Sequence, residues 1–259
     1  MRLEVLLSVM NYKLKDLDKH NITSDCIVIN QCDKDDYKKH KNFKIYSYKE
    51  RGHANSCNRA LEHATADILI FCDDDVKYNT YYDKQIIKAF EDNPKADMII
   101  FNVINKYRKK RFNERVKRLH FYNILNYASY NIAFKRDSIK DLKMDPLFGA
   151  GATYSSGGDD TLFLIGALKR GLKVYTTPVT IGNITTDDST WFKGYNNKYF
   201  NDKGSLYTAI CKPFRYLLFL QHLIRHRELL TDLSFTQAYK EMVKGSKEYL
   251  KRFKSWECC

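Results

Sequence analysis

The sequence predicts an α/β protein with a mixed, mostly parallel sheet flanked by helices and a C-terminal helical extension. Five short apolar runs read as strands, at residues 4–9, 26–30, 44–48, 68–72 and 98–103. Helices are predicted between some of these runs, at residues 54–64 and 81–91. Strands that alternate with helices are typical of βαβ units. Apolar runs without polar alternation are typical of strands buried on both faces of a parallel sheet.

The second half of the chain continues the alternation and then becomes helical. We predict a strand at residues 128–134, a helix at 161–169 and a strand at 173–176. Residues 187–204 are polar and aromatic with little periodicity, which predicts a loop over the site. Beyond Pro213, a helical face with Leu217, Leu220 and Ile224 is expected to be core. The predicted domains are an α/β domain over 1–210 and a basic helical extension over 211–259.

The composition is that of an ordinary globular protein. Its 259 residues, 44% of them hydrophobic, can bury a full core. Met1 and Arg2 lead directly into a strand-like run, which predicts no signal peptide, and no apolar run approaches the length of a membrane span. The seven cysteines show no Cys-x-x-Cys spacing, which favours a reducing cytoplasm over a disulfide framework.

The charge predicts an anionic partner. The chain has 44 Lys and Arg residues against 31 Asp and Glu, a net charge of +13. Basic residues cluster at 107–118 and 244–254. Nucleic acid, anionic lipid and a pyrophosphate-containing substrate all fit this charge, and a solvated basic face is the alternative. No zinc-finger or RNP-type motif accompanies the charge, so we do not expect nucleic acid as the partner.

Three consecutive carboxylates follow the apolar run at residues 68–72. Asp73, Asp74 and Asp75 would lie at the carboxyl end of that strand, where open α/β sheets bind their ligands. Adjacent carboxylates repel each other unless a hard cation neutralises them. Mg²⁺ or Mn²⁺ held by one or two carboxylates usually shares its shell with substrate phosphates. The pattern favours metal-assisted handling of a nucleoside diphosphate, with a solvated acidic turn as the alternative.

Three motifs in a fixed order resemble the family 2 glycosyltransferases of the GT-A (Rossmann-like) fold. The first runs over residues 51–64, the second is the triplet at 73–75, and the third covers 156–163 with Gly158-Asp159-Asp160 at its centre. The family pattern is a Gly-x-x-x-x-Arg-Asn helix start, an Asp-x-Asp strand end and a later Gly-Glu-Asp that opens a helix. The likeness covers about residues 3–205, and residues 189–195 and 198–200 look like a bacterial surface-polysaccharide branch.

The resemblance implies a donor site. Asp73 would face the ribose of the nucleotide and Asp75 would reach the metal that bridges the diphosphate, with Asp73 as a second metal-binding residue. Asp74 would point away. The family also contacts the nucleotide at the exits of the first two strands and at the helix start, which adds the following donor-binding residues: Ser8, Asn30, Asp33, Arg51, Asn58 and Arg59.

Two departures from the family pattern bear on this donor site. Cys57 stands where the family's helix usually presents Arg, so a diphosphate contact is either lost or supplied by Arg51 or Arg59. No His lies between residues 180 and 194, where many relatives place a late metal ligand. Asp187 or Asp188 would then substitute, or water would complete the metal shell.

The later motifs imply the acceptor side and the catalytic base. Asp160 is the expected base, which takes the proton of the acceptor hydroxyl in an inverting transfer. Asp159 would bind the acceptor or share the base's role. Alternatively, both carboxylates complement the dipole of the helix that they open. Gly149 and Gly151 would let the backbone approach the acceptor. Trp191 would either stack on a sugar or pack under the loop.

The resemblance implies an inverting, metal-dependent glycosyltransferase with a nucleotide-sugar donor, expected to be a UDP-sugar, and Mn²⁺ or Mg²⁺ as cofactor. The acceptor would be a glycan or lipid-linked glycan of a bacterial capsule, O-antigen or other surface polysaccharide. We expect a cytoplasmic protein that can rest on the anionic inner face of the membrane. Two alternatives stay open: a metal-dependent sugar nucleotidyltransferase, and a non-enzymatic basic adaptor that binds membrane or nucleic acid.

Overall fold

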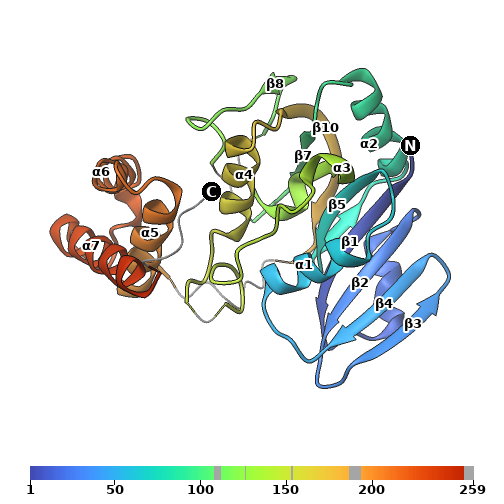
Figure 1. The fold of residues 1–259 in the computed structure, drawn as a ribbon, viewed down its shortest axis with the longest axis horizontal. Helices are drawn as coiled ribbons and strands as arrows, with labels where there is room; N and C mark the ends of the chain where they lie inside the picture. The colour runs from blue at the N-terminus through green and yellow to red at the C-terminus, as the bar shows by residue number, and fades with distance from the viewer. Residues whose placement is uncertain (108–111, 126, 153, 187–193, 254–259) are drawn as a thin grey trace. The chain divides into compact units, whose positions relative to one another are not determined.

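The chain forms two compact units. The structure, a computed structural model, describes residues 1–107, 112–125, 127–152, 154–186 and 194–253 (Figure 1). The first unit comprises Met1–Pro146 and Asp159–Asp188 and contains the sheet; the second comprises Leu147–Gly158 and Ser189–Cys259 and is helical. The boundary predicted at residue 210 therefore falls inside the second unit.

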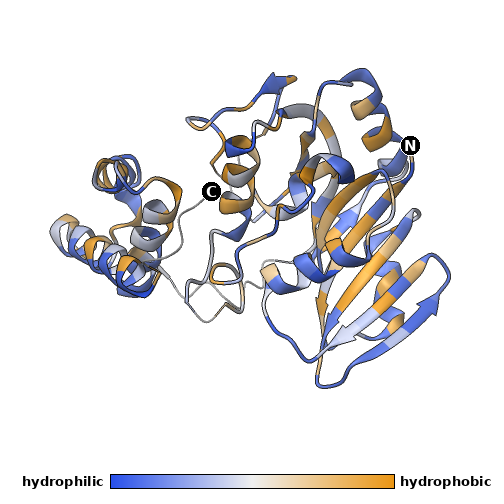
Figure 2. Ribbon diagram, viewed as in Figure 1, coloured by the Kyte–Doolittle hydropathy of each residue, from blue (hydrophilic) through white to orange (hydrophobic). Residues whose placement is uncertain are grey.

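Four parallel strands form one half of the sheet. They lie side by side in the order β4 (Phe43–Tyr48), β2 (Asp25–Gln31), β1 (Leu3–Met10) and β5 (Ile68–Asp73). The first five residues of β1 and of β5 are buried, as expected for strands covered on both faces. Figure 2 shows apolar residues along the central strands β2 and β5, whereas β4 alternates apolar with polar residues.

The other half of the sheet is mixed. β9 (Ile132–Lys135) runs antiparallel between β5 and β7 (Met98–Ile104), and β10 (Val174–Ile184) lies parallel to β7. Register shifts bend β10, so its far end pairs antiparallel with β6 (Val76–Tyr78). Two further strands pair at the margins: β3 (Asp36–His40) with β4, and β8 (Lys117–Arg118) with β10. The predicted mixed α/β sheet with flanking helices is confirmed.

Alternation along the strands distributes side chains between two helical layers. Ile70 of β5 shares a core cluster with residues of α2 (Tyr82–Asp92) on one face. Phe71 and Asp73 point to the opposite face, where the Phe71 ring lies 5.4 Å from Phe163 of α4 (Asp159–Lys169) and Asp73 meets α1 (His53–His63). This face therefore carries the acidic strand end. The remaining short helices of the first unit are η1 (Leu14–His20), η2 (Ser129–Asn131) and α3 (Arg136–Ile139).

The second unit is built around two helices in close contact. α5 (Asn197–Ile210) packs on α7 (Phe235–Arg252), and α6 (Arg215–Arg225) and η3 (Arg227–Leu229) lie between them in the chain. A Cβ added at Gly204 would lie 1.9 Å from the carbonyl oxygen of Met242, and one at Gly245 would lie 2.0 Å from that of Asn201. Only glycine allows the two backbones to approach this closely.

Two sequence predictions for this region are wrong. The loop predicted over residues 187–204 is partly helix, since α5 begins at Asn197 after an Asn196 cap. The face of α6 with Leu217, Leu220 and Ile224 is exposed, because the helix packs through its opposite side. In the part of the chain that the structure describes, no helix combines the length and apolarity required to cross a bilayer.

Candidate active site

The acidic residues after β5 lie beside the ends of β1 and β10. Asp73 is the last residue of β5, and the parallel register places Ser8 of β1 next to it. Asp73 and Asp75 are half-buried, whereas Asp74 is exposed. The backbone carbonyl of Asp75 accepts two hydrogen bonds of 2.8 Å, from the N–H and the hydroxyl of Thr185 just beyond β10. These bonds fix the turn between β5 and β6 that carries the carboxylates.

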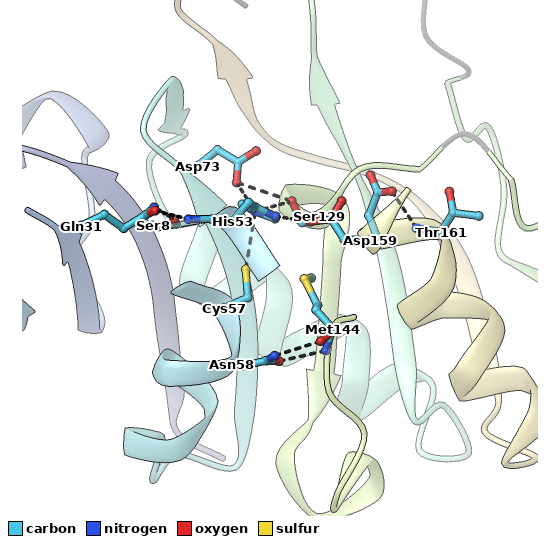
Figure 3. A network of polar contacts seen from close by, with 12 residues as sticks. Ser8, Gln31, His53, Cys57, Asn58, Asp73, Ser129, Met144, Asp159 and Thr161 are labelled. Carbon is cyan, nitrogen blue, oxygen red and sulfur yellow. Dashed lines mark hydrogen bonds and ion pairs between the residues drawn. The ribbon is translucent and has the colours of Figure 1, made fainter. Parts of the chain in front are cut away.

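His53, the first residue of α1, lies between two carboxylates from distant parts of the first unit (Figure 3). Its Nδ1 lies 2.6 Å from Oδ2 of Asp159, and its Nε2 lies 3.1 Å from Oδ1 of Asp73. An ionised carboxylate only accepts hydrogen bonds, so both ring nitrogens must carry a proton for both contacts to be hydrogen bonds. The geometry therefore fits an imidazolium shared by two carboxylates.

The surroundings of His53 favour this charged form. Burial opposes the charge, but the carboxylates of Asp159 and Asp73 outweigh burial, so the pKa of His53 lies well above its ordinary value. Only 16% of the His53 side chain and 8% of the Asp159 side chain are exposed, so water screens this pair little. Without a cation between them, the two carboxylates would repel each other.

Ser129 and Cys57 complete the contacts of His53 Nε2. The hydroxyl of Ser129, a buried residue of η2, lies 3.4 Å from this nitrogen and 3.5 Å from Oδ1 of Asp73. Cys57 lies one turn after His53 on α1, with its Sγ 3.5 Å from the same nitrogen. Burial raises the pKa of the Cys57 thiol, which keeps the sulfur neutral.

Gln31, the last residue of β2, connects β1 to the start of α1. Its Nε2 donates to the Ser8 hydroxyl at 3.3 Å, and its Oε1 accepts from the backbone N–H of Gly52 at 2.8 Å. Gly52 has a φ of 109°, a conformation that favours glycine. This connection determines where α1 begins, and therefore where the ring of His53 lies.

The predicted base-contacting residues lie at the exit of β2. Asn30 accepts from the N–H of Tyr12 at 2.9 Å and donates to the Ser47 hydroxyl at 3.2 Å, so it holds the segment after β1 against β4. Asp33 accepts a 2.7 Å hydrogen bond from Arg51, and 94% of its side chain is exposed. Asn30 is thus occupied by the protein itself, while Asp33 is accessible to a ligand.

The predicted acceptor-side residues are divided between the units. Asp160 is the second residue of α4, and the backbone N–H of Thr161 donates to its Oδ1 at 2.6 Å. Gly149 and Gly151 belong to the second unit and adopt φ values of 105° and 76°, which favour glycine. Trp191, Asp187 and Asp188 lie outside the described residues.

Comparison with known families identifies the chain. Residues 20–155, more than half of its length, match the family described as glycosyl transferase family 2. The chain belongs to glycosyl transferase family 2. No curated protein matches it in a sequence search.

Solved structures with a similar fold include two glycosyltransferases. Residues 1–349 of TarS from S. aureus in complex with UDP give a TM-score of 0.56 at 15% identity, over 99% of this chain and 73% of that one. The same TarS fragment with UDP-GlcNAc gives 0.53 at 15% identity, over 99% and 74%. The mannosyltransferase PcManGT from Pyrobaculum calidifontis, with GDP-Man and Mn²⁺, gives 0.52 at 15% identity, over 99% and 77%. At this identity the likeness concerns the fold.

Arg59, one of the two residues expected to supply the diphosphate contact that Cys57 lacks, pairs with neighbouring carboxylates. Arg59 pairs with Glu50 at 2.9 Å and Glu62 at 3.1 Å, and its guanidinium lies 5.1 Å from the centre of the Tyr48 ring. Arg51 pairs with Asp33, as described above. Within the described ranges, the basic side chain that contacts Asp73 is that of His53.

Asn58, predicted to bind the donor, forms two hydrogen bonds with Met144. Its amide donates to the carbonyl of Met144 and accepts from the N–H of the same residue, both at 2.9 Å (Figure 3). These two bonds fasten the segment after α3 to α1. Both polar atoms of the amide are therefore engaged with the protein.

Sequence reasoning missed His53 and Ser129. For His53 a signal existed: it follows Gly52 at a predicted helix start and precedes Cys57 by four residues, so both side chains lie on one side of the helix. For Ser129 we find no local signal, because a serine before an apolar run is common.

The donor atoms at the end of β5 suit a hard divalent cation. Asp73 and Asp75 present carboxylate oxygens, which Mg²⁺ and Mn²⁺ prefer to nitrogen or sulfur. Among the residues with described positions, no group of three or more His, Cys, Asp and Glu side chains is placed to hold a metal ion. A cation held by one or two carboxylates takes the rest of its shell from phosphates and water.

Proposed function

We propose that this family 2 chain is a metal-dependent, inverting glycosyltransferase that moves a sugar from a nucleotide-sugar donor to a hydroxyl of a glycan or lipid-linked glycan. The observation that carries the proposal is the bridge Asp73–His53–Asp159, because it joins the strand-end motif to the motif that opens α4. The UDP and UDP-GlcNAc complexes of TarS and the GDP-Man complex of PcManGT support a nucleotide-sugar donor. We expect a UDP-sugar.

The donor would bind at the ends of β1, β2 and β5. Asp73 and Asp75 would hold Mn²⁺ or Mg²⁺, which when bound acts as a Lewis acid on the departing diphosphate. Asp73 would also contact the ribose, with Ser8 beside it in the sheet. At the exit of β2, the exposed carboxylate of Asp33 would accept a hydrogen bond from the base. Asn30 would support this site by holding the segment after β1.

Asp160 would act as the general base. The acceptor oxygen loses its proton to this carboxylate and attacks the anomeric carbon, while the bond from that carbon to the diphosphate oxygen breaks. Asp159 is less suitable, because it is buried and already paired with His53 at 2.6 Å. This leaves Asp159 to position the start of α4, so that its neighbour faces the acceptor.

The context proposed for the reaction is bacterial surface-polysaccharide synthesis at the inner face of the cytoplasmic membrane. Four exposed basic residues of α7 would meet anionic lipid there: Lys244, Lys247, Lys251 and Arg252. Lys254, which belongs to the same basic cluster of the sequence, lies outside the described residues. The acceptor-side roles of Gly149, Gly151 and Trp191 remain part of the same proposal.

A screen of donors tests the function. The protein would be incubated with UDP-glucose, UDP-galactose, UDP-GlcNAc and GDP-mannose, with Mn²⁺ or Mg²⁺ or with a chelator, and release of nucleoside diphosphate would be measured. We expect one donor to release diphosphate only when the metal is present. Asp74→Ala serves as the matched control for Asp75→Ala, since both changes remove one carboxylate from the same turn.

Two outcomes would contradict the proposal. Absence of release from every donor, with and without acceptor oligosaccharides, would argue against a transferase and favour a basic adaptor. Pyrophosphate release from a nucleoside triphosphate and a sugar 1-phosphate would identify a nucleotidyltransferase instead.

A further inference from the structure

Helix α6 exposes an apolar stripe on the side opposite to its packed face. Phe219 and Leu223, 0% and 1% exposed, belong to a core cluster that includes residues of α7. Leu217, Leu220 and Ile224 are 62%, 39% and 55% exposed. Spacings of three and four residues place these three side chains on one side of the helix. We call them the α6 stripe.

Helix α6 and the residues that lead into it are basic and contain no acid. No Asp or Glu occurs between Lys212 and Arg227. Arg215 begins the helix and Arg225 ends it, and Phe214 before the helix is 64% exposed. Exposed Leu, Ile and Phe side chains with flanking Arg and Lys are typical of helices that lie in the plane of a membrane interface.

We propose that the α6 stripe inserts among the lipids of an anionic bilayer surface, with the exposed side chains of Lys212, Arg225 and Arg227 at the headgroup phosphates. The apolar side chains leave water, while the long stems of the arginines let their charged ends stay in the headgroup layer. The inference rests on the proposed function only for the biological reason to bind a membrane, which is that a lipid-linked acceptor would be found at that surface. Adsorption itself requires neither donor nor acceptor.

A second copy of the chain fits this face less well than lipid. In a two-fold contact the same surface meets itself, so the basic residues around the stripe would face the basic residues of the other copy. Three exposed cations of each copy would lie at the contact: Lys212, Arg225 and Arg227. Like charges repel, and the nearest carboxylate, Glu228, lies 3.2 Å from His226 of its own chain. Anionic headgroups supply the opposite charge.

Co-sedimentation of the full chain with vesicles tests the inference. Vesicles of phosphatidylcholine mixed with phosphatidylglycerol would be compared with vesicles of phosphatidylcholine alone, without donor, acceptor or metal. We expect binding to the anionic vesicles at low salt and release as salt screens the charges. The double variant Leu217→Gln and Ile224→Gln should lower the partition coefficient about tenfold or more, because two apolar side chains no longer enter the bilayer.

A matched control replaces two apolar residues of the first unit that are about half exposed. Leu14 and Val116 are 48% and 49% exposed, and their double change to Gln should leave vesicle binding unchanged. Thermal melting monitored by circular dichroism would verify that both variants are folded. Equal binding by the α6 variant and the control, or no binding by the unmodified chain, would overturn the inference.

Two further readouts distinguish lipid binding from dimerisation and from catalysis. Sedimentation velocity without lipid would reveal a dimer; a dimer that the α6 variant abolishes would assign the stripe to a second copy and overturn the inference. Release of nucleoside diphosphate, measured separately in solution, reports on the proposed function. A chain that binds vesicles but has no transferase activity would contradict that function and leave the lipid site standing.

Discussion

His53 is predicted to make the first unit less stable as pH rises above neutrality. Its pKa in the folded state lies well above the ordinary value, because the carboxylates of Asp159 and Asp73 outweigh the opposing effect of burial. Between about 6.5, the pKa in the unfolded chain, and that raised value, the folded protein binds one proton more than the unfolded chain. The free energy of unfolding therefore falls with rising pH across this window, and the full contribution of His53 is present below about pH 6.5.

One extra proton corresponds to a loss of about 1.4 kcal/mol for each pH unit within the window. His53→Gln removes the titrating imidazole and introduces a side-chain amide that can still donate a hydrogen bond to a carboxylate. The free energy of unfolding would be measured by urea titration at about pH 6, 7 and 8, in metal-free buffer, for both proteins. The free energy of unfolding of the unmodified chain should exceed that of His53→Gln by an amount that falls by about 1.4 kcal/mol for each pH unit.

His63→Gln is the matched control, at the other end of the same helix. Burial lowers the pKa of His63, whose Nε2 lies 2.7 Å from the Tyr48 hydroxyl. The folded and unfolded forms of His63 are therefore both neutral above about pH 6.5, and its replacement should not alter the slope there. Identical slopes for the unmodified chain and His53→Gln would refute the shared-imidazolium geometry.

Three further changes test the remaining assignments. Asp75→Ala should abolish sugar transfer, and Asp74→Ala should retain most of it because Asp74 faces solvent. Equal losses in a steady-state assay would refute the assignment of Asp75 as a metal ligand. Asp160→Asn should lower kcat by about 10² or more, since general-base assistance contributes 10²–10⁴-fold, with donor binding by calorimetry unchanged. An unchanged kcat would place the base elsewhere. Gly204→Ala should destabilise the second unit by roughly 1–3 kcal/mol in thermal melting, since the new methyl group meets backbone of α7. Gly157→Ala, whose Cβ would meet nothing within 4 Å, is its control, and equal melting temperatures would contradict the close helix contact.

The buried strands could be predicted because burial on both faces leaves a continuous apolar signal. The run at 68–72 became β5 with one added residue, Asp73. β3 carries no such signal: it is a polar edge strand with the sequence Asp-Tyr-Lys-Lys-His, four of whose residues are exposed, and its pairing with β4 stabilises it. Lysines on an edge strand also discourage pairing with other chains.

The second unit was harder to predict, because its packing depends on partners far along the chain. Gly204 suggested the end of a loop, yet it lies inside α5 where α7 crosses closely. The apolar residues of α6 lie on two sides of the helix, so periodicity alone does not identify the core side. The core side is the one that carries Phe219, which packs in an apolar cluster with residues of α5 and α7.

Residues of the candidate site were proposed from the sequence where single residues carry a chemical signature. Asp73, Asp75 and Asp160 stood out because carboxylates at a strand end and at a helix start suit metal binding and proton transfer. His53 did not, since its partners lie 106 and 20 residues away and only folding brings them together.

The shared imidazole of His53 has a consequence for how this site can change over evolution. His53 and Cys57 are one helical turn apart and reach the same point, so a cation is needed from only one of the two positions. A chain with arginine at position 57 would no longer depend on histidine at position 53. A chain that loses histidine at position 53 while keeping cysteine at position 57 would leave Asp73 and Asp159 in mutual repulsion. Among homologous sequences, these two positions should therefore covary, and neither should be read as freely variable by itself.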